Sequence, residues 1–163
     1  MRFFLVALLG LLACPYASYA SSSEREITCL AQAIYYEARG ESKQGRLAVG
    51  QVVLNRVEHD GYPKSVCGVV FQNRHLKNRC QFSFACDGNG DLPRASSVWQ
   101  RSKSEANELY ACDASCRAVR DSEEWDDPVW SSTHYHANYV QPSWALKLKR
   151  TASIGHHTFY RET

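Results

Sequence analysis

The sequence predicts a mainly helical α+β domain that contains a small β-hairpin or sheet and is stabilised by disulfides. Three stretches carry apolar residues at helical spacing, short stretches near the C-terminus alternate like strands, and cysteines are frequent. The chain of 163 residues has room for one domain. No internal repeat, linker or low-complexity segment divides it.

The first predicted helix begins after Ser23, which with Glu26 forms a capping-box pattern. Gly40 is suited to end this helix, because glycine readily takes the left-handed backbone conformation that follows a helix. Glu37 falls in the last turn, at the margin of the apolar stripe, and should face partly inward. A helix C-terminus and partial burial both favour the protonated form of a carboxyl group.

The second helix is expected over Gln44–Val57, where the apolar stripe is too wide for a surface helix. A buried strand over Leu47–Leu54 is the alternative, because the segment is rich in valine. Between Cys67 and Asp91 we expect loops and a small hairpin pinned by a disulfide. A third helix should start near Ala95 and continue, with or without a break at Asp113, through Cys116 to Val119.

The C-terminal part should supply the remaining strands. Thr133–Ala137 alternates apolar and polar residues, and Ile154–Tyr160 has the composition of a final strand. A turn at Pro142–Trp144 separates them. The β-structure is therefore expected to be small beside the three helices.

Residues 1–20 predict a secretory signal peptide, which leaves residues 21–163 as the mature domain. Arg2 is the positively charged residue at the start of the signal, and Phe3–Ala13 is its apolar core. Ser18–Ala20 is a small-x-small cleavage site. The apolar run is short for a membrane span. The alternative is a lipoprotein signal over residues 1–13, since Leu11–Cys14 resembles a lipobox. Cys14 would then be lipidated and attach the protein to a membrane.

Six cysteines remain for pairing in either case. An even count behind an export signal predicts disulfides formed in an oxidising compartment. Spacing alone does not choose among the fifteen connectivities that six cysteines allow. A zinc site of paired C-x-x-C motifs is not favoured, because the sequence contains no such pair. The six are Cys29, Cys67, Cys80, Cys86, Cys112 and Cys116.

The charge balance argues against a nucleic-acid partner. Nineteen Lys and Arg residues are scattered among seventeen acids, for a net charge of +2, and they form no basic run. We expect a monomer with no cofactor.

Glu37 is the candidate for acid–base chemistry. A carboxyl group can protonate the leaving oxygen of a glycosidic bond near neutral pH only if its pKa is raised, and Tyr35, Tyr36 and Ala38 offer apolar surroundings. The alternative is a solvated carboxylate paired with Arg39 or Lys43. Two-carboxylate hydrolysis would need a second acid, and nothing in the sequence selects one. The available acids are Glu41, Asp60, Asp87 and Asp91.

His134 and His136 point the same way on the predicted strand and could bind zinc with a third ligand. We favour the interpretation that these histidines form hydrogen bonds within an aromatic cleft, since no H-E-x-x-H motif accompanies them. We therefore assign no metal site.

Several blocks of the chain, taken in order, resemble the cell wall hydrolase family of SleB, the spore-cortex-lytic enzyme. The blocks cover nearly all of the predicted mature chain. They are Ala31–Glu41, Gly45–Val57, Tyr62–Val70, Cys80–Phe84 with Asp87-Gly88, and Ile154–Tyr160.

The resemblance implies a compact lysozyme-like domain that acts on peptidoglycan, with Glu37 as the catalytic acid. It further implies lytic transglycosylation, in which the glutamate protonates the oxygen between N-acetylmuramic acid and N-acetylglucosamine. The muramic 6-hydroxyl then attacks C1, so no second carboxylate is needed. Motif positions Gln81, Ser83, His134 and Tyr135 are expected to line the substrate cleft.

Two other functions stay open from the sequence. One is a zinc-dependent N-acetylmuramoyl-L-alanine amidase that uses His134 and His136; the other is a non-catalytic peptidoglycan-binding module. The many cysteines lead us to expect an exported protein in the periplasm of a Gram-negative bacterium, without a role in spore germination.

Overall fold

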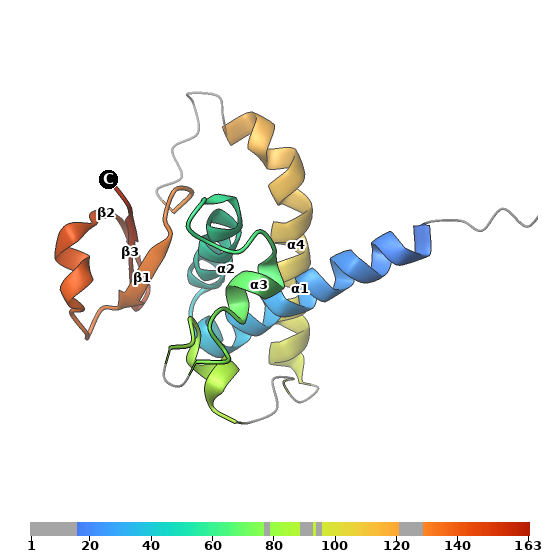
Figure 1. The fold of residues 1–163 in the computed structure, drawn as a ribbon, viewed down its shortest axis with the longest axis horizontal. Helices are drawn as coiled ribbons and strands as arrows, with labels where there is room; N and C mark the ends of the chain where they lie inside the picture. Colours follow the sequence, from blue (N-terminus) through green and yellow to red (C-terminus); the bar gives the residue numbers. More distant parts are fainter. Residues whose placement is uncertain (1–15, 77–78, 89–92, 94–95, 121–128) are drawn as a thin grey trace, which may run out of the picture.

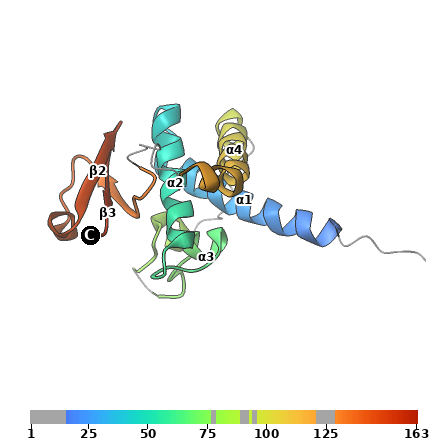
Figure 2. The ribbon, with the colours of Figure 1, turned by 90° about the horizontal axis from the view of Figure 1, so that it is seen from above.

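The computed structural model describes residues 16–76, 79–88, 93, 96–120 and 129–163. Helices α1, α2 and α4 form one body, and a three-stranded sheet lies on the far side of α2 from α4 (Figure 1). A view from above shows the same order of sheet, α2 and then the other helices (Figure 2). The predicted α+β class, mainly helical with a small sheet, is confirmed.

Helix α1 spans Tyr16–Ala38, so the expected start at Ser23 is wrong. The helix runs through the capping-box pattern, and the Glu26 carboxylate instead accepts a hydrogen bond from the Cys67 backbone N–H at 3.1 Å. That N–H lies in the first turn of α3, Val66–Val70, where a carboxylate is favourable. The predicted signal core and Cys14 lie outside the described residues, and the predicted cleavage site, Ser18–Ala20, lies within α1.

Helix α2 spans Lys43–Glu58 and is buried along most of its length, which confirms the helix and rules out the strand. Its first turn is capped by the Ser42 hydroxyl, which accepts from the Gly45 N–H at 3.2 Å. At Gly50 an added Cβ would lie 2.5 Å from Leu109 and 3.0 Å from Ile34. Glycine there lets α1 and α4 approach α2, and this packing outweighs the low helix propensity of the valines. Helix α4, Ser97–Arg120, continues past Cys116 as predicted.

The expected hairpin between Cys67 and Asp91 is wrong. The described residues of this region form α3 and a 3₁₀ helix, η1, over Ser83–Cys86. Phe82 and Phe84 alternate with polar residues as in a strand, but both rings are buried in the helical core. Anchoring both rings there favours a tight turn over an extended pair.

The sheet has the order β1-β3-β2 and is antiparallel throughout. Its strands are β1, His134–Ala137; β2, Lys149–Ile154; and β3, His157–Arg161. The single final strand expected over Ile154–Tyr160 is therefore wrong. The chain reverses at Gly155, whose φ of +57° suits glycine, and forms a hairpin. A short 3₁₀ helix, η2, Ser143–Lys147, connects β1 to β2.

The sheet joins the helical body through a second apolar cluster. Phe159 of β3 is fully buried and packs with Val49 and Val52 of α2 and with Ala38 at the end of α1. Register places Phe159 opposite Tyr135 of β1. The end of α1 and the face of β1 that carries Tyr135 therefore meet beside α2.

Disulfides are confirmed for Cys29–Cys67 and Cys80–Cys86, and Cys112 is also disulfide-bonded. The first links α1 to α3, and the second closes the loop that carries η1. None of the helices, within the described residues, is long and apolar enough to cross a membrane.

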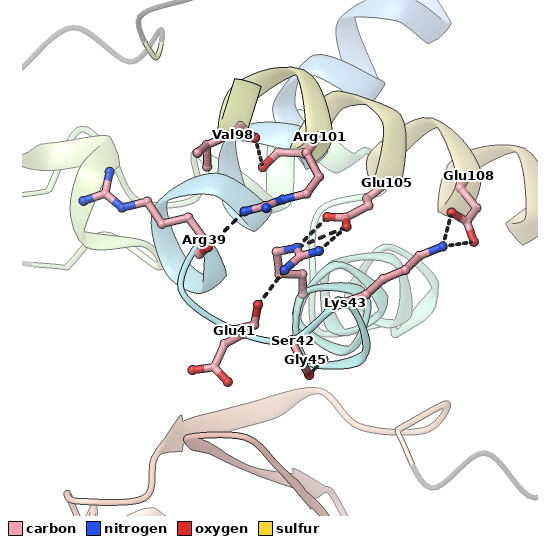
Figure 3. A network of polar contacts seen from close by, with 11 residues as sticks. Arg39, Glu41, Ser42, Lys43, Gly45, Val98, Arg101, Glu105 and Glu108 are labelled. Carbon is pink, nitrogen blue, oxygen red and sulfur yellow. Dashed lines mark hydrogen bonds and ion pairs between the residues drawn. The ribbon is translucent and has the colours of Figure 1, made fainter. Parts of the chain in front are cut away.

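A polar network ties the loop after α1 to α4 (Figure 3). Arg46 of α2 donates from Nη2 to Glu105 of α4 at 2.6 Å, and both side chains are more than 90% buried. Arg46 also donates from Nη1 to the Glu41 backbone carbonyl at 2.5 Å. The Arg46 guanidinium therefore holds the α1–α2 loop against α4.

We expect Glu105→Ala to destabilise the fold by about 3–5 kcal/mol, because it leaves the buried Arg46 charge without its carboxylate. The matched control is Glu108→Ala, which breaks a solvent-exposed pair with Lys43 and should cost at most about 1 kcal/mol. Chemical denaturation of both variants measures the difference. Equal losses would show that the Arg46–Glu105 pair does not hold the loop.

Candidate active site

Glu37 lies in the last turn of α1 and is half-buried. The neighbouring Tyr36 ring stacks on the Phe84 ring, with 4.5 Å between the ring centres. The Tyr35 ring meets the Trp99 ring edge-on, with 6.0 Å between the ring centres. Burial raises the pKa of Glu37, and this outweighs the hydrogen bond from Tyr135 and the charge of Arg56, which both lower it. A carboxyl group with a raised pKa holds its proton to higher pH, as a general acid requires.

Tyr135 reaches Glu37 from β1. Its hydroxyl donates to Oε2 of Glu37 across 3.4 Å, a long and weak hydrogen bond. Burial and the nearby Glu37 carboxylate raise the pKa of Tyr135 well above its usual value, so the hydroxyl keeps its proton. Because Oε2 accepts this bond, the proton of a neutral Glu37 is expected on Oε1.

The polar side chains of α2 hold the backbone that leads into β1. Asn55 donates from Nδ2 to the carbonyls of Val129 and Ser132, at 3.0 and 2.7 Å. Gln51 donates to the Asn55 Oδ1 at 2.9 Å and fixes the orientation of that amide. We call Gln51, Asn55 and Arg56 the α2 clamp. It sets where β1 starts and hence where Tyr135 lies.

Arg56 is the charged member of the α2 clamp and is only 3% exposed. Its Nε donates to the Thr133 carbonyl at 2.7 Å, and its guanidinium lies 5.5 Å from the Tyr62 ring centre and 5.7 Å from that of Phe82. Burial lowers the pKa of Arg56, while Tyr135, Tyr62 and Glu37 counteract it. A buried positive charge is therefore fixed to the backbone that leads to Tyr135, the hydrogen-bond donor to Glu37.

Glu41 connects the α1–α2 loop to the sheet. Its carboxylate accepts from the His156 backbone N–H at 3.2 Å and lies 2.9 Å from Nδ1 of His156. Figure 3 shows this carboxylate pointing away from α4 toward the sheet. A Cβ on Gly155 would lie 1.9 Å from Oε2 of Glu41, so only glycine permits this approach. Burial would raise the pKa of Glu41, but the bonds from His156 outweigh it and lower the pKa.

The structure brings Tyr135, alone among the four predicted cleft residues, into a hydrogen bond with Glu37. Gln81 and Ser83 are exposed, on the segment whose alternate residues, Phe82 and Phe84, are buried near the site. His134 is half-buried, and its ring centre lies 5.3 Å from that of Trp144. Because successive side chains of a strand point to opposite faces, His134 projects from the face of β1 opposite to Tyr135.

His136 offers no free ring nitrogen for a metal. Its Nδ1 lies 2.9 Å from the Ala137 carbonyl, to which it must donate, and its Nε2 lies 3.0 Å from the Tyr160 hydroxyl. No group of three or more potential metal ligands occurs in the part of the chain that the structure describes. The geometry of His136 therefore does not support the zinc alternative.

A family model for cell wall hydrolases matches residues 40–160, about three quarters of the chain. The chain belongs to the cell wall hydrolase family. The matched residues include the α2 clamp and Tyr135 and begin just after Glu37, whose role is therefore argued from its geometry.

Curated relatives and solved structures agree with this family. The chain is 29% identical over 138 residues to the spore cortex-lytic enzyme of Oceanobacillus iheyensis, covering 84% of this chain and 42% of the relative. It is 29% identical over 141 residues to that of Halalkalibacterium halodurans, covering 86% and 36%. The chain thus spans less than half the length of these relatives.

Two solved catalytic domains share the fold. The Bacillus cereus SleB catalytic domain aligns with a TM-score of 0.61 and 26% identity, covering 85% of this chain and 91% of that one. The catalytic domain of the germination-specific lytic transglycosylase SleB from Bacillus anthracis aligns with a TM-score of 0.59 and 26% identity, covering 83% and 93%. The domain described here therefore has the fold of these catalytic domains.

The expected Gram-negative periplasm is wrong on this comparison, because the relatives are spore cortex-lytic enzymes of Gram-positive bacteria. Disulfides indicate an oxidising environment but do not distinguish one type of cell envelope from another. The cysteine pattern therefore could not predict a Gram-negative periplasm.

The α2 clamp and the Glu41–His156 contact were not predicted from the sequence. A signal for the clamp was present, since Gln51 and Asn55 are polar residues four positions apart in an otherwise apolar helix. Such residues must find partners when they are buried. Their partners are far away in sequence, so the pattern did not reveal which segment they hold.

We expect Glu37→Gln to stabilise the folded domain at pH 7, by on the order of 1 kcal/mol, because it removes a carboxylate from a half-buried site. The unfolded chain loses this proton near the ordinary pKa of 4.5 and the folded protein loses it at higher pH. The advantage of the variant should therefore vanish as the pH falls below about 4.5.

Thermal melting across this pH range measures the effect, with the exposed Glu24→Gln on the same helix as control. If the two variants show the same pH dependence, Glu37 is solvated like Glu24.

Proposed function

We propose that this domain cleaves the glycan strand of peptidoglycan between N-acetylmuramic acid and N-acetylglucosamine as a lytic transglycosylase. The observation that carries the proposal is one half-buried glutamate, Glu37, with a raised pKa and a tyrosine hydroxyl on one carboxyl oxygen. Membership of the cell wall hydrolase family supports the substrate. One of its structural neighbours carries the name of a lytic transglycosylase.

In the first step Glu37 gives its proton to the glycosidic oxygen as the bond to C1 of the muramic residue breaks. In the second, the Glu37 carboxylate accepts the proton of the muramic 6-hydroxyl as that oxygen bonds to C1. The glutamate ends protonated, and the products are an N-acetylglucosamine end and a 1,6-anhydromuramic end. One carboxyl group suffices, because no water has to be activated on the opposite face.

The next carboxyl group along the chain, Glu41, is unsuited to be a second acid. It is bound by His156 through two contacts, and its pKa is lowered. A carboxylate that is held ionised cannot donate a proton near neutrality. Glu41 instead positions the sheet, and with it Tyr135, relative to the end of α1.

We expect Glu37→Gln to lower the rate of cleavage of purified sacculi by on the order of 10²–10⁴-fold, the usual contribution of a general acid. Glu24→Gln should retain full activity. Mass spectrometry of the wild-type products should find 1,6-anhydromuropeptides. Reducing muramic ends would indicate hydrolysis, and free stem peptides an amidase. Full activity of Glu37→Gln would refute the role of Glu37.

Cleavage should also depend on pH, because the free enzyme must carry a protonated Glu37. The pKa of Glu37 is raised above 4.5, so kcat/KM should stay high above that pH and fall as the pH rises through the raised value. Initial rates on soluble glycan fragments measure this alkaline limb. A limb at or below pH 4.5 would contradict the assignment.

A further inference from the structure

Arg56 carries a buried charge that the fold does not neutralise with an ion pair. The residue is 3% exposed, and its Nε is bound by the Thr133 carbonyl at 2.7 Å. Its Nη1 is buried and has no hydrogen-bond partner within the described residues, and no described carboxylate lies within ion-pair distance. The Thr133 carbonyl, a hydrogen bond with Tyr62 and the two aromatic rings compensate this charge in part. A buried charge without a carboxylate partner is still costly, so its presence calls for an explanation.

The groups around Arg56 include the candidate acid and its hydrogen-bond donor, Tyr135. The rings of Tyr62 and Phe82 lie beside the guanidinium and limit the access of water. The ionisable groups that interact with it are Tyr62, Tyr135 of β1 and Glu37 of α1, and its charge also acts on His134. Glu37 is the carboxyl group of this set.

The bond to Thr133 fixes Arg56 to the backbone that carries Tyr135, two residues further on. The guanidinium and the Tyr135 hydroxyl, which contacts Glu37 at 3.4 Å, are thus held by one segment. A cation held in place before the reaction needs no reorganisation when charge develops on its neighbour.

The proposed reaction changes the charge of Glu37 from neutral to negative in its first step. A nearby fixed cation hardly affects the neutral acid but stabilises the carboxylate, and it does so more strongly where water is excluded. We propose that Arg56 is a positioning residue whose buried positive charge stabilises the Glu37 carboxylate formed when the acid gives up its proton. This inference rests on the proposed role of Glu37.

The test compares Arg56→Gln and Arg56→Met, which are neutral, with Arg56→Lys, which keeps the charge. Carbon-13 NMR follows the titration of the Glu37 side chain without substrate, and the resonance is assigned by its absence in Glu37→Gln. In both neutral variants Glu37 should titrate at higher pH than in the wild type, since the stabilising charge is gone. Arg56→Lys should stay close to the wild type. Lys64→Met, which removes an exposed charge, is the control.

Activity provides the second measurement. The neutral variants should lose about tenfold or more in kcat, while the alkaline limb of kcat/KM moves to higher pH; Arg56→Lys should restore both in part. If Arg56 were purely structural, its neutral variants would lose activity and melt at a lower temperature, but the alkaline limb of kcat/KM would stay at the same pH.

Folded neutral variants in which Glu37 titrates as in the wild type would overturn the proposal. Unfolding of both neutral variants but not of Arg56→Lys would also count against it, because the charge would then serve the fold. The titration does not depend on the reaction. Full cleavage by Glu37→Gln would therefore refute the proposed function and leave the measured coupling between Arg56 and Glu37 intact.

Discussion

The site depends on the grip of α2 on the backbone of residues 129–133. The α2 clamp directs polar groups into an interface that is otherwise apolar. Asn55 binds the carbonyls of Val129 and Ser132, Arg56 binds that of Thr133, and Gln51 orients the Asn55 amide. Buried carbonyls need donors, and only one register of the two segments satisfies all of them. The apolar contact of Phe159 with α2 supplies affinity without specifying register. The polar bonds therefore determine where β1 presents Tyr135.

Two further contacts hold the end of α1 in the same frame. Arg46 binds the Glu41 carbonyl and Glu105, which fixes the loop after α1 to α4. The Glu41 side chain binds His156 in the β2–β3 turn, which fixes the same loop to the sheet. Glu37, at the end of α1, thus lies between elements that are all attached to one another. Such rigidity suits the proposed reaction, which relies on one carboxyl group.

The local electrostatics balance opposing influences on Glu37. Burial favours the neutral acid, while Tyr135 and Arg56 favour the carboxylate. In the proposed reaction Glu37 first donates a proton and then accepts one. Such a group needs a pKa near the working pH, because an extreme value in either direction would block one of the steps. At this site burial raises the pKa of Glu37, while Tyr135 and Arg56 lower it.

Periodicity and spacing determined much of this protein by themselves. They predicted three helices, the strand at β1 and the disulfides, because these follow from side-chain period and cysteine parity. They also placed Glu37 at a helix end facing inward. The hairpin expected between Cys67 and Asp91 failed because the burial of Phe82 and Phe84 in a helical core imitates strand alternation.

Only the tertiary structure decided what surrounds Glu37. Tyr135 lies 98 residues away in sequence, and the Asn55–Ser132 and Arg56–Thr133 bonds each span 77. Local patterns report which face of an element is buried, but not which distant segment covers it. The identity of the catalytic candidate was thus accessible from the sequence and its resemblance to a family. The tyrosine and the buried cation that tune it became visible only when the chain was folded.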